Sequence, residues 1–148
     1  MATFILTVIG DDRPGLVSAL SAPIKAHGAS WERSQMSRLA GKFAGIVLVA
    51  VADERLDALA ADLTALEAQG VQVTLERTDE PVERQSLRLH LELLGADHPG
   101  IVAEVSASLA ACGVSIEELT TDVREAPMAG GMLFEARAVL ETSVPWVS

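Results

Sequence analysis

A short turn motif occurs twice in this sequence, and the repeat limits the folds that the chain can adopt. The motif reads Asp12-Arg13-Pro14-Gly15-Leu16-Val17, and it recurs at an offset of 85 residues as Asp97-His98-Pro99-Gly100-Ile101-Val102. The same offset relates Gly28 to Gly113. Because a fixed offset is the signature of a duplicated structural unit, we expect one unit to be used twice.

The residues around the first copy predict a strand, a turn and a helix. An apolar run at residues 4–9 precedes the motif, and Leu16, Leu20 and Ile24 follow it at four-residue spacing. That spacing places one apolar stripe on a helix. We expect the helix to begin at Pro14, which needs no N–H in the first turn, and to end at Gly28, a favourable left-handed cap.

The rest of the first half predicts two more strands, a second helix and a closing strand. Two extended runs, at residues 30–39 and 43–52, flank a short turn that contains a glycine, which is typical of a hairpin. Leucines at helical spacing then run from Leu56 to the Gly70 stop, and residues 71–77 alternate again. The order is βαββαβ, the split-βαβ or ferredoxin-like arrangement with both helices on one face of an antiparallel sheet.

The second half repeats this order but has fewer residues for its end. An alternating run at 87–94 precedes the second motif, and a third strand is predicted near residues 132–140. The fold class is therefore α+β, with two tandem ferredoxin-like modules at 1–78 and 87–148 and a polar linker at 79–86. The first module uses 26 residues, 53–78, for its second helix and last strand. We expect the second module to be incomplete, with either a cut sequence or another chain accounting for the missing layer.

Composition excludes several classes of protein. The net charge of −10 repels phosphate backbones, and aromatic residues make up only 3%, without a tyrosine for base stacking. Direct nucleic-acid binding is therefore not expected. Cys112 is the single cysteine, so neither a disulfide nor a cysteine metal cage is expected. With no apolar run long enough to cross a membrane and no secretion signal, we expect a cytoplasmic protein.

The repeated turn could hold a small zwitterion. A strand that ends where a helix begins directs free backbone N–H groups and the positive end of the helix dipole toward a carboxylate. Gly15 and Gly100 allow a ligand to approach the backbone, and Asp12 and Asp97 could pair with an ammonium group. The alternative interpretation is structural, because each Asp could cap its helix and each Pro-Gly could simply start it.

These residues resemble the ACT domain, and the tandem pair resembles the glycine cleavage system transcriptional repressor family. The resemblance implies a regulatory module that binds an amino acid between paired modules. It places polar second-strand residues opposite the loops, here Ser34, Gln35, Glu117 and Thr120. Arg13 and His98 occupy equivalent loop positions and add a basic or titratable side chain to the site. The candidate ligand-binding residues are therefore Asp12, Arg13, Pro14, Gly15, Leu16, Asp97, His98, Pro99, Gly100 and Ile101.

The resemblance also implies how such a protein would act. It implies a homodimer that responds to an amino acid, with glycine or serine as the leading candidates, and that represses transcription by binding a LysR-type activator without reading DNA itself. No cofactor and no metal are implied. The negative net charge agrees with this indirect mode.

Two alternatives come from other functional classes, and catalysis is not expected. His27, His90 and His98 fall on a helix end, a strand and a loop, without metal-ligand spacing or a nucleophile and base. The chain could instead be a regulatory ACT fragment of a larger enzyme of amino-acid metabolism. It could also be a ligand-free dimerisation module that uses the strand at 43–52, which is apolar on both faces.

Overall fold

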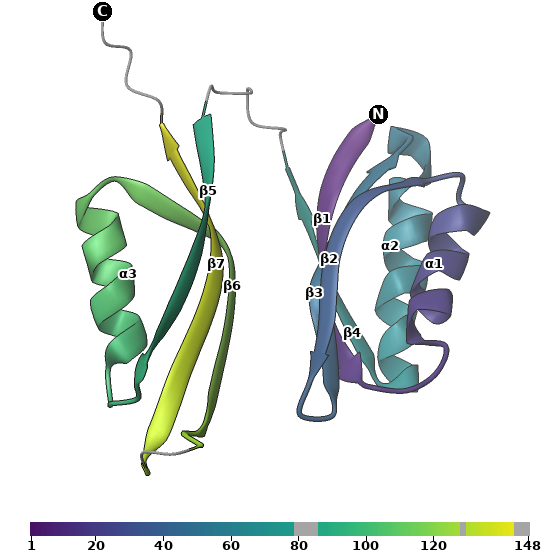
Figure 1. The fold of residues 1–148 in the computed structure, drawn as a ribbon. Helices are drawn as coiled ribbons and strands as arrows, with labels where there is room; N and C mark the ends of the chain where they lie inside the picture. The colour runs from purple at the N-terminus through teal and green to yellow at the C-terminus, as the bar shows by residue number, and fades with distance from the viewer. Residues whose placement is uncertain (79–85, 128–129, 144–148) are drawn as a thin grey trace, which may run out of the picture. The chain divides into compact units, whose positions relative to one another are not determined.

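The computed structural model describes residues 1–78, 86–127 and 130–143 of the 148-residue chain. The chain divides into two compact units, Met1–Pro81 and Val82–Ser148 (Figure 1). The predicted linker, residues 79–86, lies outside the described residues except for Ser86, which is the first residue of a strand. Each unit is considered by itself below.

The first unit has the predicted βαββαβ order. The sheet order is β2-β3-β1-β4, with antiparallel pairing at every interface, and both helices cover the same face of the sheet (Figure 1). This is the predicted ferredoxin-like arrangement. The elements are β1 (Ala2–Asp11), α1 (Leu16–Ala26), β2 (Ser30–Leu39), β3 (Lys42–Val51), α2 (Leu56–Thr64) and β4 (Val71–Arg77), with short 3-10 turns at Asp53–Arg55 and Ala65–Gln69 beside α2.

Helix α1 begins at Leu16 instead of the predicted Pro14. The reason is Gly15, whose φ of 86° is left-handed and cannot belong to a right-handed helix.

The hairpin turn between β2 and β3 forms where the sequence predicts it. The turn between β2 and β3 has positive φ at both Ala40 and Gly41, as in the two-residue hairpin turns whose twist matches the strands.

The core of the first unit lies between the sheet and the two helices. Alternate residues of β1 point toward the helices because successive side chains of a strand face opposite sides. Leu20 of α1 and Leu59 and Leu63 of α2 are fully buried against them. The buried core residues are Ala2, Phe4, Leu6, Val8, Leu16, Leu20, Ile24, Val47, Val49, Val51, Leu59, Leu63, Leu66 and Val71.

The second unit has the same topology over fewer described elements. Its sheet order is β5-β7-β6, and one helix, α3, lies on one face (Figure 1). The elements are β5 (Ser86–Ala96), α3 (Ile101–Ala111), β6 (Val114–Glu125) and β7 (Met132–Ser143). A counterpart of α2–β4 is absent from the described residues, and 144–148 lie outside them. Burial is correspondingly shallow, since no residue of α3 is buried.

The sheet faces away from the helices, here called the open faces, differ between the units. On β3 the open face carries Ile46 and Leu48, and its neighbours on β1 are also apolar or Thr. On β7 the equivalent positions are Arg137 and Val139, paired with Glu92 and His90 of β5. The alternation of charged residues with leucine along β5 predicted this wet face. At these positions the open face of the first sheet is therefore uncharged, and the open face of the second sheet is charged.

Candidate functional site

The first copy of the repeated motif forms a tight connection between β1 and α1. The Asp12 backbone N–H donates to the carbonyl of Gly41, with N···O 3.0 Å, which fixes the end of β1 to the β2–β3 turn. Gly15 then reverses the chain with φ 86° and ψ 2°. The N–H of Leu16 donates to the carbonyl of Arg13 at 3.4 Å, and the N–H of Ala19 makes the first helical bond to Gly15 at 2.8 Å.

The second copy reproduces this geometry bond for bond. The Asp97 backbone N–H donates to the carbonyl of Met132 at 2.9 Å, and the N–H of Ile101 donates to the carbonyl of His98 at 3.3 Å. Gly100 has φ 84° and ψ 8°, and the N–H of Glu104 bonds to its carbonyl at 3.0 Å. The sequence repeat is therefore also a repeat of backbone conformation.

Both loops leave their backbone open to a ligand. A side-chain carbon added at Gly15 or Gly100 would meet nothing within 4 Å, so the space beside each glycine is free among the described residues. Helix geometry leaves the N–H groups of Val17 and Ser18 without an intrahelical acceptor. The first turn of each helix can therefore donate hydrogen bonds to an anion, aided by the helix dipole.

The aspartates of the motif do not cap the helices. Neither α1 nor α3 has a side-chain hydrogen bond at its N-cap, and the N-cap residue is the glycine in each case. Asp12 instead approaches Arg38 of β2, with Oδ2···Nη1 3.5 Å, and its side chain remains one-third exposed. The alternative interpretation, in which each aspartate caps its helix, is therefore wrong. The Asp12 carboxylate therefore lies at the loop edge, where it contacts one cationic group.

The remaining loop residues have distinct surroundings in the two copies. Arg13 Nη2 donates to the carbonyl of Gln69 at 3.2 Å, which ties the loop to the segment before β4. His98 has Nδ1 3.1 Å from the Pro99 carbonyl and Nε2 3.4 Å from Glu104. Leu16 is buried in the core, so it can offer a ligand only its backbone.

The four second-strand candidates do not share one face. Ser34 pairs with the buried Val47, whereas Gln35 pairs with Ile46 of the open face. Thr120 pairs with Arg137 on the open face of the second sheet. Glu117 lies at a register shift in β6. A hydrogen bond with Glu141 and then the guanidinium of Arg88, 3.0 Å away, hold the pKa of Glu117 below its ordinary value.

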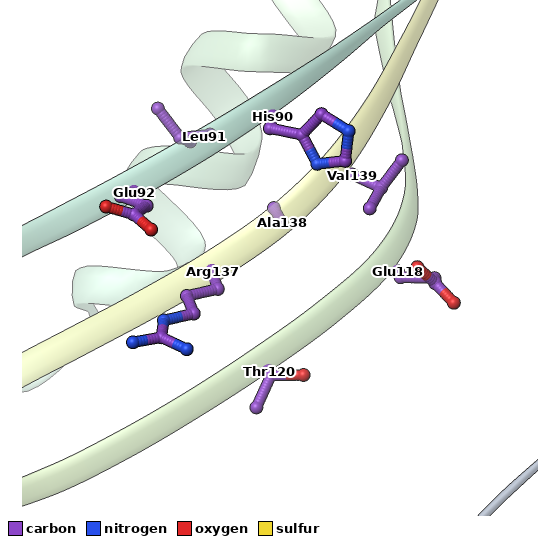
Figure 2. Close-up of a pocket in the computed structure, with 8 residues that line it drawn as sticks. All are labelled: His90, Leu91, Glu92, Glu118, Thr120, Arg137, Ala138 and Val139. Carbon is purple, nitrogen blue, oxygen red and sulfur yellow. The ribbon is translucent and has the colours of Figure 1, made fainter.

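The structure also shows a shallow pocket that the sequence reasoning missed. It has a volume of about 240 Å³ and lies on the open face of the second sheet, where all three strands contribute to it (Figure 2). Its lining residues are His90, Leu91, Glu92, Glu118, Thr120, Arg137, Ala138 and Val139. The alternating charges of β5 were the available signal, but strand pairing decides which charges of β6 and β7 join them.

The lining of this pocket mixes charged, polar and apolar side chains. Charges of both signs line the pocket: Arg137 pairs with Glu92 across the strands, and Glu118 and the imidazole of His90 complete the polar part of the lining (Figure 2). In the described part of the chain, no group of three or more His, Cys, Asp or Glu side chains could hold a metal ion. Across the same residues no helix is long and apolar enough to span a membrane.

Comparisons with known proteins place this geometry in a family. The ACT domain family matches residues 2–76. A crystal structure of an unknown protein from Galdieria sulphuraria is 34% identical, with a TM-score of 0.80 over 96% of this chain and 82% of that one. A structure titled "putative glycine cleavage system transcriptional repressor" is 14% identical, with a TM-score of 0.73 over 96% of this chain and 81% of that one, and shows the shared fold. No curated protein matches the sequence. The chain belongs to the ACT domain family.

Proposed function

We propose that this chain is a cytoplasmic amino-acid sensor that regulates through a protein partner, in the manner of the glycine cleavage repressors. The observation that carries the proposal is the loop geometry: two copies of one motif keep the same left-handed glycine, the same backbone hydrogen bonds and an open first helical turn.

The ligand chemistry follows from the groups at each loop. Free N–H groups at the start of α1 and α3 suit a carboxylate, and Asp12 or Asp97 suits an α-ammonium group. An amino acid carries both groups two bonds apart. Glycine and serine are the leading candidates from the resemblance. The residues that would surround them are Asp12, Arg13, Pro14, Gly15, Leu16, Asp97, His98, Pro99, Gly100 and Ile101, and the free backbone N–H groups just after Leu16 and Ile101 would receive the carboxylate.

The readout would be a change in protein association. A net charge of −10 disfavours contact with DNA, so the regulator would act on another protein, with a LysR-type activator as the partner that the resemblance implies. We propose a homodimer in which ligand binding shifts the packing of modules. A ligand has this effect only if it binds one arrangement more tightly than the other.

The test is thermal unfolding of the full chain against a panel of amino acids. A ligand at 100 times its dissociation constant adds about 2.7 kcal/mol of stability, so a selective rise in Tm is the expected result. N-acetylglycine, which lacks the ammonium group, and glycinamide, which lacks the carboxylate, are matched controls that should not raise Tm. The absence of a shift with every amino acid would contradict the proposal and favour a ligand-free dimerisation module.

Loop variants separate binding from folding. Asp12→Asn and Asp97→Asn keep the size of each side chain and remove the charge that faces the ammonium group. We expect each to weaken glycine or serine binding at least tenfold by calorimetry, since a charge-assisted hydrogen bond contributes about 1.5–3 kcal/mol. The Tm without ligand should be unchanged, because neither carboxylate caps a helix. Unchanged affinity in the double variant would remove the loops from the site.

A further inference from the structure

The open face of the first sheet is apolar along its two central strands. In the sheet order β2-β3-β1-β4 the strands β3 and β1 are central, and the side chains that they place on this face at residues 3–9 and 44–50 are apolar or threonine. These side chains, here called the central stripe, are Thr3, Ile5, Thr7, Ile9, Ala44, Ile46, Leu48 and Ala50. Ile9 and Ile46 are 44% and 47% exposed, so the stripe would gain stability by leaving water.

Two unpaired charges lie on either side of the stripe in a single row across the sheet. Arg33 of β2 pairs with Leu48 of the stripe, which pairs with Ile5. On its other side Ile5 pairs with Glu76 of β4. Paired residues of neighbouring strands share a face, so the row runs from a cation on one edge strand to an anion on the other. Both charged side chains are exposed, and neither forms an ion pair with another described residue.

The order of this row makes the face complementary to itself. A two-fold axis that runs along the strands between two facing copies places β2 of one copy over β4 of the other, and β3 over β1. Arg33 then faces Glu76 of the second copy, twice by symmetry, and Leu48 faces Ile5. This arrangement also keeps the strands of the two sheets nearly aligned, as is common in packed β-sheets. A two-fold axis across the strands would instead place each strand over itself and would leave both charges without an opposite charge.

The neighbouring rows agree with the same axis. Gln35 and Thr74 occupy the edge positions of the next row, so an amide would face a hydroxyl of the second copy. One row further, Ala44 pairs with Ile9, and the axis places the small side chain of one copy over the large one of the other. Alternation of small and large side chains lets facing layers interdigitate. The complementarity therefore extends over three consecutive rows.

The size of the face indicates how strong the contact should be. Four strands about 4.8 Å apart and four rows about 7 Å apart cover roughly 500 Å² on each copy. This area is near the lower limit for specific interfaces, so we expect a dissociation constant in the micromolar range. A dimer of this strength dissociates readily, and a ligand that prefers one state can therefore shift its equilibrium.

We propose that the open face of the first sheet binds the same face of a second copy of this chain, with the central stripe buried and two symmetric ion pairs between Arg33 and Glu76 at its sides. The inference rests on the homodimer of the proposed function and assigns the surface that forms it. A sheet face with charges at its centre is a poorer occupant, because those charges would lose water above the stripe without gaining partners.

Sedimentation equilibrium of the full 148-residue chain measures the dimer at concentrations from about 1 to about 300 µM. We expect a monomer–dimer equilibrium in the parent and at least tenfold weaker dimerisation in Ile46→Lys, which places a charge in the stripe. Leu119→Lys is the matched control, because Leu119 is 46% exposed and lies on β6 of the second unit, outside the proposed interface. This control should dimerise as the parent does.

Charge exchange tests the pairing without placing a charge in the stripe. Arg33→Glu and Glu76→Arg each create two like-charge contacts across the axis, and each should weaken dimerisation at least tenfold. The two substitutions change the net charge in opposite directions, so general repulsion between acidic chains cannot explain a loss in both. An equimolar mixture of the two variants restores opposite charges at both contacts, and the heterodimer should form with about the parental Kd.

Three results would overturn the proposal: a parent chain that is monomeric at about 300 µM, equal dimerisation by the parent and Ile46→Lys, or no recovery in the mixture of charge variants. A monomeric parent that Ile46→Lys destabilises would identify another segment of the chain as the occupant of this face. The amino-acid Tm shift is measured on Ile46→Lys in parallel. A shift that persists while these tests fail would remove the interface and leave the ligand site of the loops in place.

Discussion

The strands β1 and β5 occupy equivalent positions in the two units, but their apolar side chains are buried to different extents. On its helix side β1 carries Ala2, Phe4, Leu6 and Val8, all buried, and β5 carries leucine at each equivalent position. The more apolar strand is the more exposed one. Burial is set by the elements that pack on a strand from elsewhere in the chain, and the local alternation gives only the face that they would cover.

The comparison predicts its largest effect for a matched pair of truncations. Phe4→Ala should lower the free energy of unfolding of the first unit by about 3–5 kcal/mol, because it removes a fully packed ring and leaves a cavity. Leu89→Ala removes a side chain that is 41% exposed and should cost less than about 1 kcal/mol. Urea unfolding followed by circular dichroism, with hydrogen exchange to assign each transition to a unit, measures both. Equal losses would mean that the two faces are equally buried in solution.

We expect a smaller difference in unfolding free energy between substitutions at Gly45 of β3, where β2 and β3 lie close together, and at the equivalent position of β7. An added Cβ at Gly45 would run into the carbonyl oxygen of Gln35 and would lie 2.7 Å from the Cα of Met36. We expect Gly45→Ala to cost about 1–3 kcal/mol through displacement of that backbone. The register places Ala136 at the equivalent position of β7, where a methyl group is already accommodated. Ala136→Gly is the control, and a cost above that of Gly45→Ala would contradict the comparison.

The glycines before the two motifs should respond differently to one methyl group. Gly10→Ala should cost about 1 kcal/mol, because its Cβ would meet the Gly70 carbonyl oxygen at 3.0 Å and Leu16 Cδ1 at 3.2 Å. Gly95→Ala should be neutral or stabilising by up to about 1 kcal/mol, since it reduces the freedom of the unfolded chain without a clash. Thermal unfolding of the two variants side by side is sufficient. A loss at Gly95 equal to that at Gly10 would show that a segment already packs on β5.

The smallest expected effect concerns an ion pair that one unit has and the other lacks. Lys42 Nζ donates to Asp11 Oδ1 at 2.6 Å, and this hydrogen bond and charge hold the pKa of Asp11 below its ordinary 3.8. The equivalent pair on β5 and β7 is Ala96 and Leu133. Because the folded pKa is the lower one, the contribution is present above pH 3.8 and is lost as the pH falls through the folded value.

Carboxyl NMR titration of the Lys42→Met variant tests this pair. We expect the pKa of Asp11 to rise toward 3.8, with almost no change in Tm at neutral pH because both side chains are exposed. Lys25→Met, which removes a charge that the structure does not pair with Asp11, is the control. An unchanged pKa in Lys42→Met would mean that the pair does not form in solution.

Much of the fold could be predicted because its signals are local. The hairpin turn needs residues that tolerate positive φ, and the strand at 30–39 and the strand at 71–77 match the prediction at both ends. The start of α1 could not be predicted to the residue. Proline at a first turn is a statistical preference, whereas the left-handed φ of Gly15 is a conformation that only the folded loop shows.

The candidate site divides in the same way. The repeat identified both loops, and their shared geometry agrees with that identification. Three features could be found only in the tertiary structure: the contact of Asp12 with Arg38, the hydrogen bond from Arg13 to the Gln69 carbonyl, and the pocket on the open face of the second sheet. Each joins residues that are distant in sequence, and no spacing rule specifies such pairs.

The sequence alone therefore determined the duplication, the order of strands and helices, and the two turns that could receive a ligand, because these depend on periodicity and on the backbone preferences of glycine and proline. The tertiary structure decided which apolar faces are covered and which charges meet. Burial of Phe4 and exposure of Leu89 come from equivalent positions in one repeat. The difference arises because packing is a property of the neighbours that a strand acquires.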